Sequence, residues 1–307
     1  MQELVQERVA TLGARAWPFA VTIAMPAFNE GHGIAQVIAA VRAQVPDAEV
    51  LVVDDASSDD TAAIAEAAGA RVIRHPYNKG NGASVKTAIR NARGDVLLII
   101  DADGQHNPAD ITRLLERMER YDMAVTVRSH ASHASRARGL GNWLIARFAS
   151  YVAGMEFADL TSGFRAMRVE VIREFVHLLP NRYSWPTTSL LCLAKAGYSI
   201  AFVPIDARPR SGGKSGQKLL QNGFKFLTII MRIVMLFSPL RVFFPVSLIM
   251  LTLSLLAYLA SVFFGTGGWL KIPNATDALF VGAIVVFMFG LLAEQIVALG
   301  LGGRRDR

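Results

Sequence analysis

Residues 96–108 read VLLIIDADGQHNP, an apolar and β-branched run that changes abruptly into a polar segment. The same change occurs after earlier apolar runs at 21–25, 49–53 and 71–73, and a further apolar run follows at 123–127. Between these runs lie stretches typical of helices, at 33–45, 60–69, 82–93 and 108–120. Strands that alternate with helices predict an α/β fold with a doubly wound, mostly parallel sheet.

Polar segments follow four of these predicted strands, at 26–30, 54–61, 78–83 and 101–108. Any one of them has an ordinary explanation as a helix cap or a turn. Ligands of a doubly wound sheet, however, bind beyond the carboxyl ends of its strands. Four polar segments at successive strand ends therefore indicate a binding site.

Composition narrows the class of protein. The chain has 307 residues, of which 52% are apolar and 19% charged, and its formal net charge is +7. Disordered, collagen-like and disulfide-stapled proteins are excluded by these values. The single cysteine, Cys192, lies in an apolar run and is predicted to be a buried packing thiol.

Two long runs near the C-terminus predict a transmembrane hairpin within residues 241–307. Residues 242–264 contain no charge over 23 positions, and the run 278–303 contains only Glu294 as a charged residue. Each is long enough to cross a hydrocarbon core of about 30 Å. The alternative is a buried hairpin in the core of a soluble protein.

The charges around this hairpin predict its orientation. Arg241 precedes the first run, and Arg304, Arg305 and Arg307 follow the second, whereas the loop between them holds only Lys271 and Asp277 as charged residues. The positive-inside rule then places both ends in the cytoplasm. Since the first 20 residues lack an apolar signal region, we expect a multi-pass protein of the cell (inner) membrane with both termini cytoplasmic.

A basic segment precedes the hairpin. Lys218, Lys225 and Arg232 recur every seven residues and share a helical face, and apolar residues fill much of the remainder. This pattern predicts an amphipathic helix over 211–240 that lies in the membrane interface, with an ordinary solvent-facing helix as the alternative. Nucleic-acid binding is not expected, because no recognition motif accompanies the charge.

Asp101 and Asp103 stand at alternate positions after an apolar strand, where their carboxylates can share a hard divalent cation. Mg²⁺ or Mn²⁺ prefers such oxygen ligands and commonly also binds substrate phosphates. Gln105 could add a neutral oxygen. A metal here would stabilise a diphosphate leaving group. The histidines are not spaced as in a zinc site, and no phosphate-binding Gly-x-x-x-x-Gly-Lys-Ser/Thr loop is present.

These motifs resemble the family 2 glycosyltransferases of the GT-A fold, in particular the polyprenyl-phosphate sugar transferases. The resemblance covers residues 20–240, and paired C-terminal spans are typical of bacterial members. It implies that the donor, a UDP- or GDP-linked sugar, is bound by a set of residues at the strand ends: Pro26, Phe28, Glu30, Val52, Asp54, Asp101, Ala102 and Asp103. Asp101, Asp103 and Gln105 are the implied metal ligands. Phe28 stands where relatives commonly have tyrosine.

The acceptor side also matches the family. The resemblance implies that the lipid phosphate is held by Arg128, Arg138, Arg210 and Lys214, and arginine suits phosphate because its planar fork donates paired hydrogen bonds. The family's last lysine falls on Gly216, so Lys214 or Lys218 takes its place. The segment 183–188 departs from relatives, and it either shapes the sugar pocket or only packs the start of a helix.

The implied reaction is inverting transfer of one sugar to an undecaprenyl- or dolichyl-type phosphate at the cytoplasmic membrane face. The acceptor phosphate is already anionic near pH 7, since its second pKa is about 6, so no strong base is needed. Catalysis then rests on positioning and leaving-group stabilisation, with Asp103, Arg128 and Arg210 as the catalytic residues. The expected divisions are an extension (1–20), the transferase domain (21–210), the interface helix and the hairpin.

Two alternatives stay open. A processive polysaccharide synthase of the same fold usually has more spans and a Gln-x-x-Arg-Trp motif, which is missing here. A non-catalytic membrane scaffold would have no need of the carboxylates and arginines. Membrane transferases of this kind often assemble, so the resemblance also implies a homo-oligomer.

Overall fold

The computed structural model describes residues 17–104, 106–128, 160, 162–182, 184–205, 231, 235, 238–263 and 274–302. These residues fall into two compact units, one within 17–205 and one within 231–302. Each unit is considered by itself.

The first unit is built on a seven-stranded sheet in the order β3-β2-β1-β4-β6-β5-β7. Its strands are β1 (Val21–Ala27), β2 (Glu49–Asp54), β3 (Arg71–Arg74), β4 (Val96–Ile99), β5 (Met123–Arg128), β6 (Arg165–Arg168) and β7 (Ile200–Ile205). All neighbours run parallel except β6, which is antiparallel to both β4 and β5. The predicted mostly parallel, doubly wound sheet is therefore confirmed.

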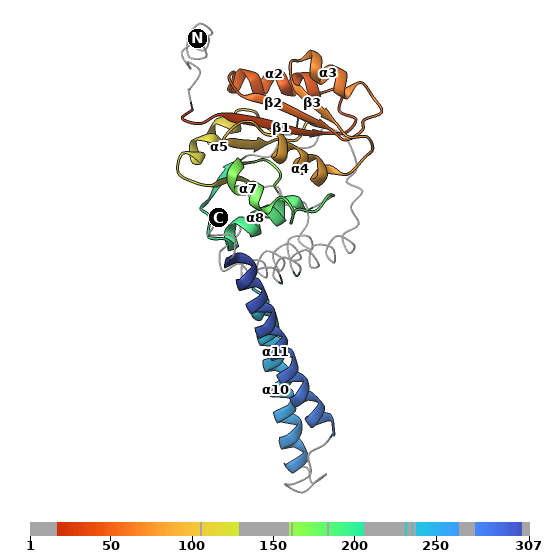
Figure 1. Cartoon of the computed structure of the whole chain (residues 1–307), viewed down its shortest axis with the longest axis vertical. Coiled ribbons are helices and arrows are strands. Elements are labelled where there is room, and N and C mark those ends of the chain that lie inside the picture. The colour runs from red at the N-terminus through yellow and green to blue at the C-terminus, as the bar shows by residue number, and fades with distance from the viewer. Residues whose placement is uncertain are drawn as a thin grey trace. The chain divides into compact units, whose positions relative to one another are not determined.

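Helices cover both faces of this sheet. They are α2 (Ile34–Gln44), α3 (Thr61–Ala67), α4 (Asn81–Asn91), α5 (Asp110–Met118), α7 (Val169–Phe175) and α8 (Trp185–Lys195). Figure 1 shows α2 and α3 on one face and α4 and α7 on the other. Strands covered on both faces are apolar at successive positions, as in β1, where Ile23, Ala24 and Met25 are all fully buried.

Cys192 lies inside this unit, on α8, and is fully buried as predicted. Burial raises the pKa of its thiol to about 12. The thiol is a packing group, because a thiol that stays protonated is neither a nucleophile nor a metal ligand at neutral pH.

The second unit contains two helices that pack side by side, α10 (Leu240–Phe263) and α11 (Asn274–Gly302) (Figure 1). Both are long and apolar enough to cross a membrane, with a mean hydropathy of 2.2 in each. The Ser254 hydroxyl donates to the Thr276 carbonyl at 2.9 Å and thereby links the two helices. Glu294 Oε2 accepts the backbone N–H of Leu240 at 3.1 Å. The predicted hairpin is present, whereas the predicted interface helix lies mostly outside the described residues.

Candidate functional site

The carboxyl ends of β1, β2, β4 and β5 meet at one edge of the sheet, because these strands share one direction. The antiparallel strand β6 begins at that same edge. Four polar segments of distant sequence are therefore brought together: 28–30, 54–61, 101–104 and 162–165. This strand-end edge is the candidate active site.

Hydrogen bonds tie the loop after β1 to the loop after β2. The backbone N–H of Asn29 donates to Ser57 Oγ at 2.9 Å, and that of Glu30 donates to Thr61 Oγ1 at 2.9 Å. Asp59 accepts the N–H of Gly31 at 3.1 Å, and a hydrogen bond from the Thr61 hydroxyl holds the pKa of Asp59 below its usual value of 3.8. The two loops form one connected rim.

Two predicted donor-binding residues lie on this rim. Phe28 is 47% exposed although it is a large apolar side chain, and Glu30 is half-buried. Pro26 lies within β1 and is buried. An exposed aromatic ring next to a carboxylate offers a stacking face and a hydrogen-bond acceptor to a ligand.

Two other predicted donor-binding residues are inside the protein. Val52 is fully buried in the middle of β2, in register with Met25 of β1 and Val72 of β3. Asp54 is also fully buried, and its carboxylate accepts the N–H of Ser57 at 3.0 Å and the hydroxyl of the same serine. Arg74 Nε lies 3.1 Å from its other oxygen. Asp54 therefore shapes the loop after β2 and presents no free surface to a ligand.

The next residue, Asp55, has a role that sequence reasoning missed. Its carboxylate is buried and accepts the N–H groups of Lys79 at 2.9 Å and Gly80 at 2.7 Å. His75 Nδ1 lies 2.7 Å from the same carboxylate, and His75 Nε2 lies 2.9 Å from the Thr87 hydroxyl. Asp55 thus anchors the loop between β3 and α4. The sequence signal that could have revealed this role is the pair Asp54-Asp55 at the end of β2. Successive residues of a strand point to opposite faces of the sheet, so two adjacent aspartates are expected to serve different partners.

The turn after β4 carries the paired carboxylates. The Asp101 side chain is 41% exposed and Asp103 is exposed, whereas Ala102 between them is buried. Gly104 has a positive φ of 70°, which lets the chain turn sharply after them. Two accessible carboxylates on one turn suit a hard divalent cation whose other ligands are water and phosphate oxygens. Gln105, the third predicted ligand, lies outside the described residues.

His106 packs against this turn. Its Nε2 lies 3.3 Å from Asp101 Oδ2, and its ring centre lies 4.8 Å from that of Phe164. Within the described part of the chain no three His, Cys, Asp or Glu side chains converge as metal ligands. A site built from several nitrogen or sulfur ligands, as zinc prefers, is therefore not found among these residues.

On the acceptor side, the end of β5 is fastened to the start of β6. Thr126 Oγ1 lies 2.6 Å from Ser162 Oγ, and the Thr126 N–H donates to the Phe164 carbonyl at 3.2 Å. Arg128 is the last residue of β5, so its backbone lies at the strand-end edge, in register with Ile205. The side chain of Arg128 and the residues Arg138, Arg210 and Lys214 lie outside the described part of the structure.

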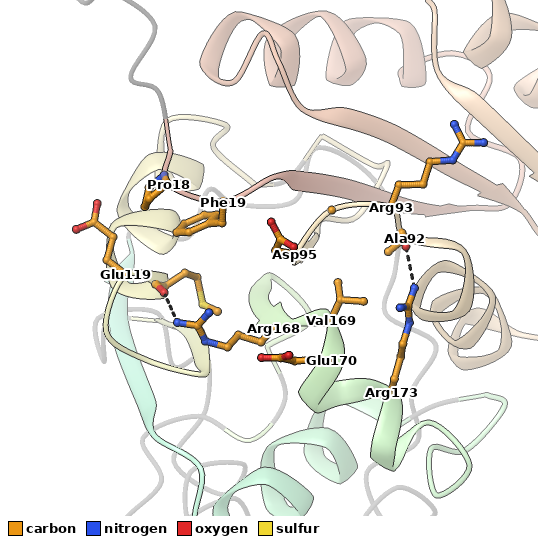
Figure 2. Close-up of a pocket in the computed structure, with 12 residues that line it drawn as sticks. Pro18, Phe19, Ala92, Arg93, Asp95, Glu119, Arg168, Val169, Glu170 and Arg173 are labelled. Atoms are coloured by element: carbon orange, nitrogen blue, oxygen red, sulfur yellow. Dashed lines mark hydrogen bonds between the residues drawn. The ribbon is translucent and has the colours of Figure 1, made fainter. Parts of the chain in front are cut away.

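A hollow of about 630 Å³ lies at the opposite edge of the sheet. Two of its arginines hold backbone carbonyls: Arg173 donates to the Ala92 carbonyl at 2.8 Å and Arg168 to the Met118 carbonyl at 3.3 Å (Figure 2). Asp95 accepts the backbone N–H of Ala20 at 2.9 Å. This hollow is a structural junction at the amino ends of the strands, away from the paired carboxylates.

Comparison with known proteins places this geometry in a family. Residues 22–176, half of the chain, match glycosyl transferase family 2, and residues 238–299 match the GtrB C-terminal hairpin. The chain is 29% identical over 205 residues to an undecaprenyl-phosphate mannosyltransferase of Micrococcus luteus, covering 62% of this chain and 84% of that protein.

A second relative extends across the hairpin. It is an undecaprenyl-phosphate 4-deoxy-4-formamido-L-arabinose transferase of an Enterobacter species, 27% identical over 301 residues, covering 92% of this chain and 86% of that protein. Among solved structures, a glucosyl-3-phosphoglycerate synthase from Mycobacterium tuberculosis with bound Mn²⁺ and UDP superposes with a TM-score of 0.57 at 20% identity, covering 71% of this chain and 80% of that one. The chain therefore belongs to glycosyl transferase family 2 and has the GT-A fold.

Proposed function

We propose that this glycosyltransferase transfers a single sugar from a UDP- or GDP-linked donor to a polyprenyl phosphate, with inversion, at the cytoplasmic face of the membrane. The observation that carries the proposal is the pair of accessible carboxylates, Asp101 and Asp103, on the same strand-end edge as the exposed ring of Phe28 and the half-buried Glu30. The two relatives named for transfer to undecaprenyl phosphate support the acceptor, as does the apolar hairpin.

On the donor side, Phe28 and Glu30 contact the nucleotide from the rim, and Pro26 sets the end of β1. Val52 and Asp54 act from inside, by holding the loop after β2 in shape, since both are fully buried. Ala102 keeps the two carboxylates on one turn because its own side chain packs inward.

Asp101 and Asp103 hold the divalent cation, together with Gln105. When bound, Mg²⁺ or Mn²⁺ supplies charge neutralisation to the leaving diphosphate. The Mn²⁺ and UDP bound by the Mycobacterium tuberculosis synthase support a divalent metal in an enzyme of this fold. The residues present fit such an ion, since both ligating side chains end in hard oxygen atoms and are accessible.

On the acceptor side, Arg128, Arg138, Arg210 and Lys214 hold the lipid phosphate in line with the sugar. A phosphate oxygen forms a bond to the anomeric carbon as the bond from that carbon to the nucleotide breaks, and the electron pair leaves with the diphosphate. No proton must be removed from an acceptor that is already ionised. The hairpin keeps the enzyme at the membrane, where a homo-oligomer is expected from the resemblance.

The test is sugar transfer by the full chain, purified in detergent, from a panel of labelled UDP- and GDP-sugars to undecaprenyl phosphate. Each donor is run with Mn²⁺, with Mg²⁺ and with EDTA. Asp103→Ala is compared with Asp47→Ala, whose side chain is exposed on the turn before β2. We expect one donor to give a single-sugar lipid that is lost with EDTA and with Asp103→Ala but retained with Asp47→Ala.

Product size separates the rival enzyme, because a processive synthase yields chains of many sugars. Absence of transfer from every donor, together with absence of nucleotide binding, would contradict the proposal and favour the scaffold.

A further inference from the structure

The backbone of residues 180–182 lies against the start of α4. The Arg182 carbonyl accepts the N–H of Gly82 at 3.0 Å, and the Asn181 carbonyl accepts the N–H of Ala83 at 2.7 Å. The first N–H groups of a helix have no partner within the helix and commonly attract anions. In this protein two of them are taken by carbonyls from elsewhere in the chain, so α4 does not offer them to a phosphate.

The contact explains two glycines of the segment 78–83. A Cβ on Gly82 would lie 2.2 Å from the Pro180 carbonyl oxygen, and one on Gly80 would lie 2.8 Å from the Asn181 carbonyl oxygen. Gly80 also has a positive φ of 98°. These glycines permit close backbone packing between two loops about a hundred residues apart in the chain.

Trp185, the first residue of α8, extends this contact toward the paired carboxylates. The indole is buried, with 3% exposure, and its Nε1 donates to Asn81 Oδ1 at 2.8 Å. The guanidinium of the buried Arg165 lies 5.1 Å from the centre of the ring. One side chain therefore joins the start of α4 to the start of β6.

The same indole also borders the turn after β4. A Cβ built on Gly163 would lie 3.7 Å from Asp101 Oδ2 and 3.7 Å from Trp185 Cζ2, so carboxylate and indole edge flank the same point. Trp185 is thus hydrogen-bonded to Asn81 and faces Asp101 across Gly163. Since Trp185 is buried, it does not itself present a face to a sugar.

We propose that Trp185 is a positioning residue, which sets the separation between the start of α4 at Asn81 and the Asp101 turn and thereby the fit of the nucleotide–metal complex. The inference rests on the proposed function, because it assigns the nucleotide diphosphate and its metal to this edge. It also gives the segment 183–188 an indirect influence on the donor, exerted through the loops that Trp185 connects.

The test is a double-mutant cycle on the hydrogen bond itself. Trp185→Phe keeps a buried ring but removes the N–H donor, and Asn81→Ala removes the side-chain acceptor Oδ1 of an exposed residue. The full chain in detergent is titrated with UDP and with GDP in the presence of Mn²⁺, by calorimetry. A net hydrogen-bond contribution of about one kcal/mol predicts that each single variant binds the nucleotide roughly 3- to 10-fold more weakly than the wild type. Because both substitutions remove the same bond, the double variant should bind the nucleotide as well as either single variant.

Trp17→Phe is the matched control, because Trp17 is half-buried ahead of β1, where it stacks on Phe19. We expect it to leave nucleotide affinity unchanged. If Trp185→Phe fails to fold, Asn81→Ala alone still tests the bond, since that residue is exposed.

Two results would overturn the inference: losses of nucleotide affinity that add up in the double variant, or lowered melting temperatures with unchanged nucleotide affinity. The proposed function would still stand in either case, provided that the wild type transfers sugar. A wild-type chain that neither binds a nucleotide with Mn²⁺ nor transfers a sugar would overturn both.

Discussion

Replacing Gly82 by alanine puts a methyl group where the backbone of residues 180–182 already lies. The new Cβ would lie 2.2 Å from the Pro180 oxygen and 2.7 Å from the Arg182 oxygen. Both neighbours are backbone atoms, so the overlap cannot be relieved by turning a side chain. The loop before α8 must move away from α4, and the hydrogen bonds from Gly82 and Ala83 must lengthen.

The cost follows from these contacts. Overpacking costs about 1–3 kcal/mol, and the two displaced backbone hydrogen bonds contribute about 1 kcal/mol each. The better helix propensity of alanine offsets about 0.5–1 kcal/mol of this loss of unfolding free energy. The net loss of unfolding free energy is then about 2–4 kcal/mol, which lowers the melting temperature of a domain of this size by roughly 5–15 °C.

The assay is thermal unfolding of the full chain in detergent, followed by tryptophan fluorescence, in which Trp185 itself reports on the loop. Gly33→Ala is the matched control, because a Cβ there would have its nearest neighbour, the Ala102 oxygen, 4.0 Å away. The control is expected to unfold with the wild type. A Gly82→Ala protein with the melting temperature of the wild type would refute the reasoning, since it would show that the backbone of residues 180–182 is not in fixed contact with the start of α4.

Three further predictions concern other parts of the molecule. Asp103→Asn should weaken Mn²⁺ binding by at least about tenfold, measured by electron paramagnetic resonance of the free ion, with an unchanged melting temperature, because an exposed ligand carries charge but little packing. Glu294→Leu should destabilise the hairpin by about 1–2 kcal/mol through loss of the cap on the Leu240 N–H, and Glu294→Gln should retain most of that stability, both read from heat denaturation in detergent. The pKa of Cys192 is raised from its usual 9.0 to about 12, so its contribution to stability is complete below pH 9 and is lost as the pH rises towards 12. Denaturant titrations across that range should show a steeper decline for the wild type than for Cys192→Ala, and equal slopes would contradict the burial of the thiol.

Much of the architecture was readable from local pattern alone. The strands at 21–27, 49–54, 71–74, 96–99 and 123–128, the helices between them and the apolar hairpin are all present where expected. Periodicity, strand length and the span needed to cross a bilayer are local properties of the chain, and parallel strands bring their carboxyl ends to one edge whatever their order. The paired carboxylates of Asp101 and Asp103 were identified on the same basis.

Tertiary structure decided what a local pattern cannot contain. The antiparallel insertion of β6 between β4 and β5 pairs Arg165 with Ile99 and places Gly163 beside Asp101, and no periodicity in the short run 165–168 signals that pairing. Burial of Val52 and Asp54 depends on cover from both faces of the sheet, which a strand's own sequence does not reveal. The bond between Asn81 and Trp185 joins residues 104 positions apart, so it exists only because packing brings the starts of α4 and α8 into contact.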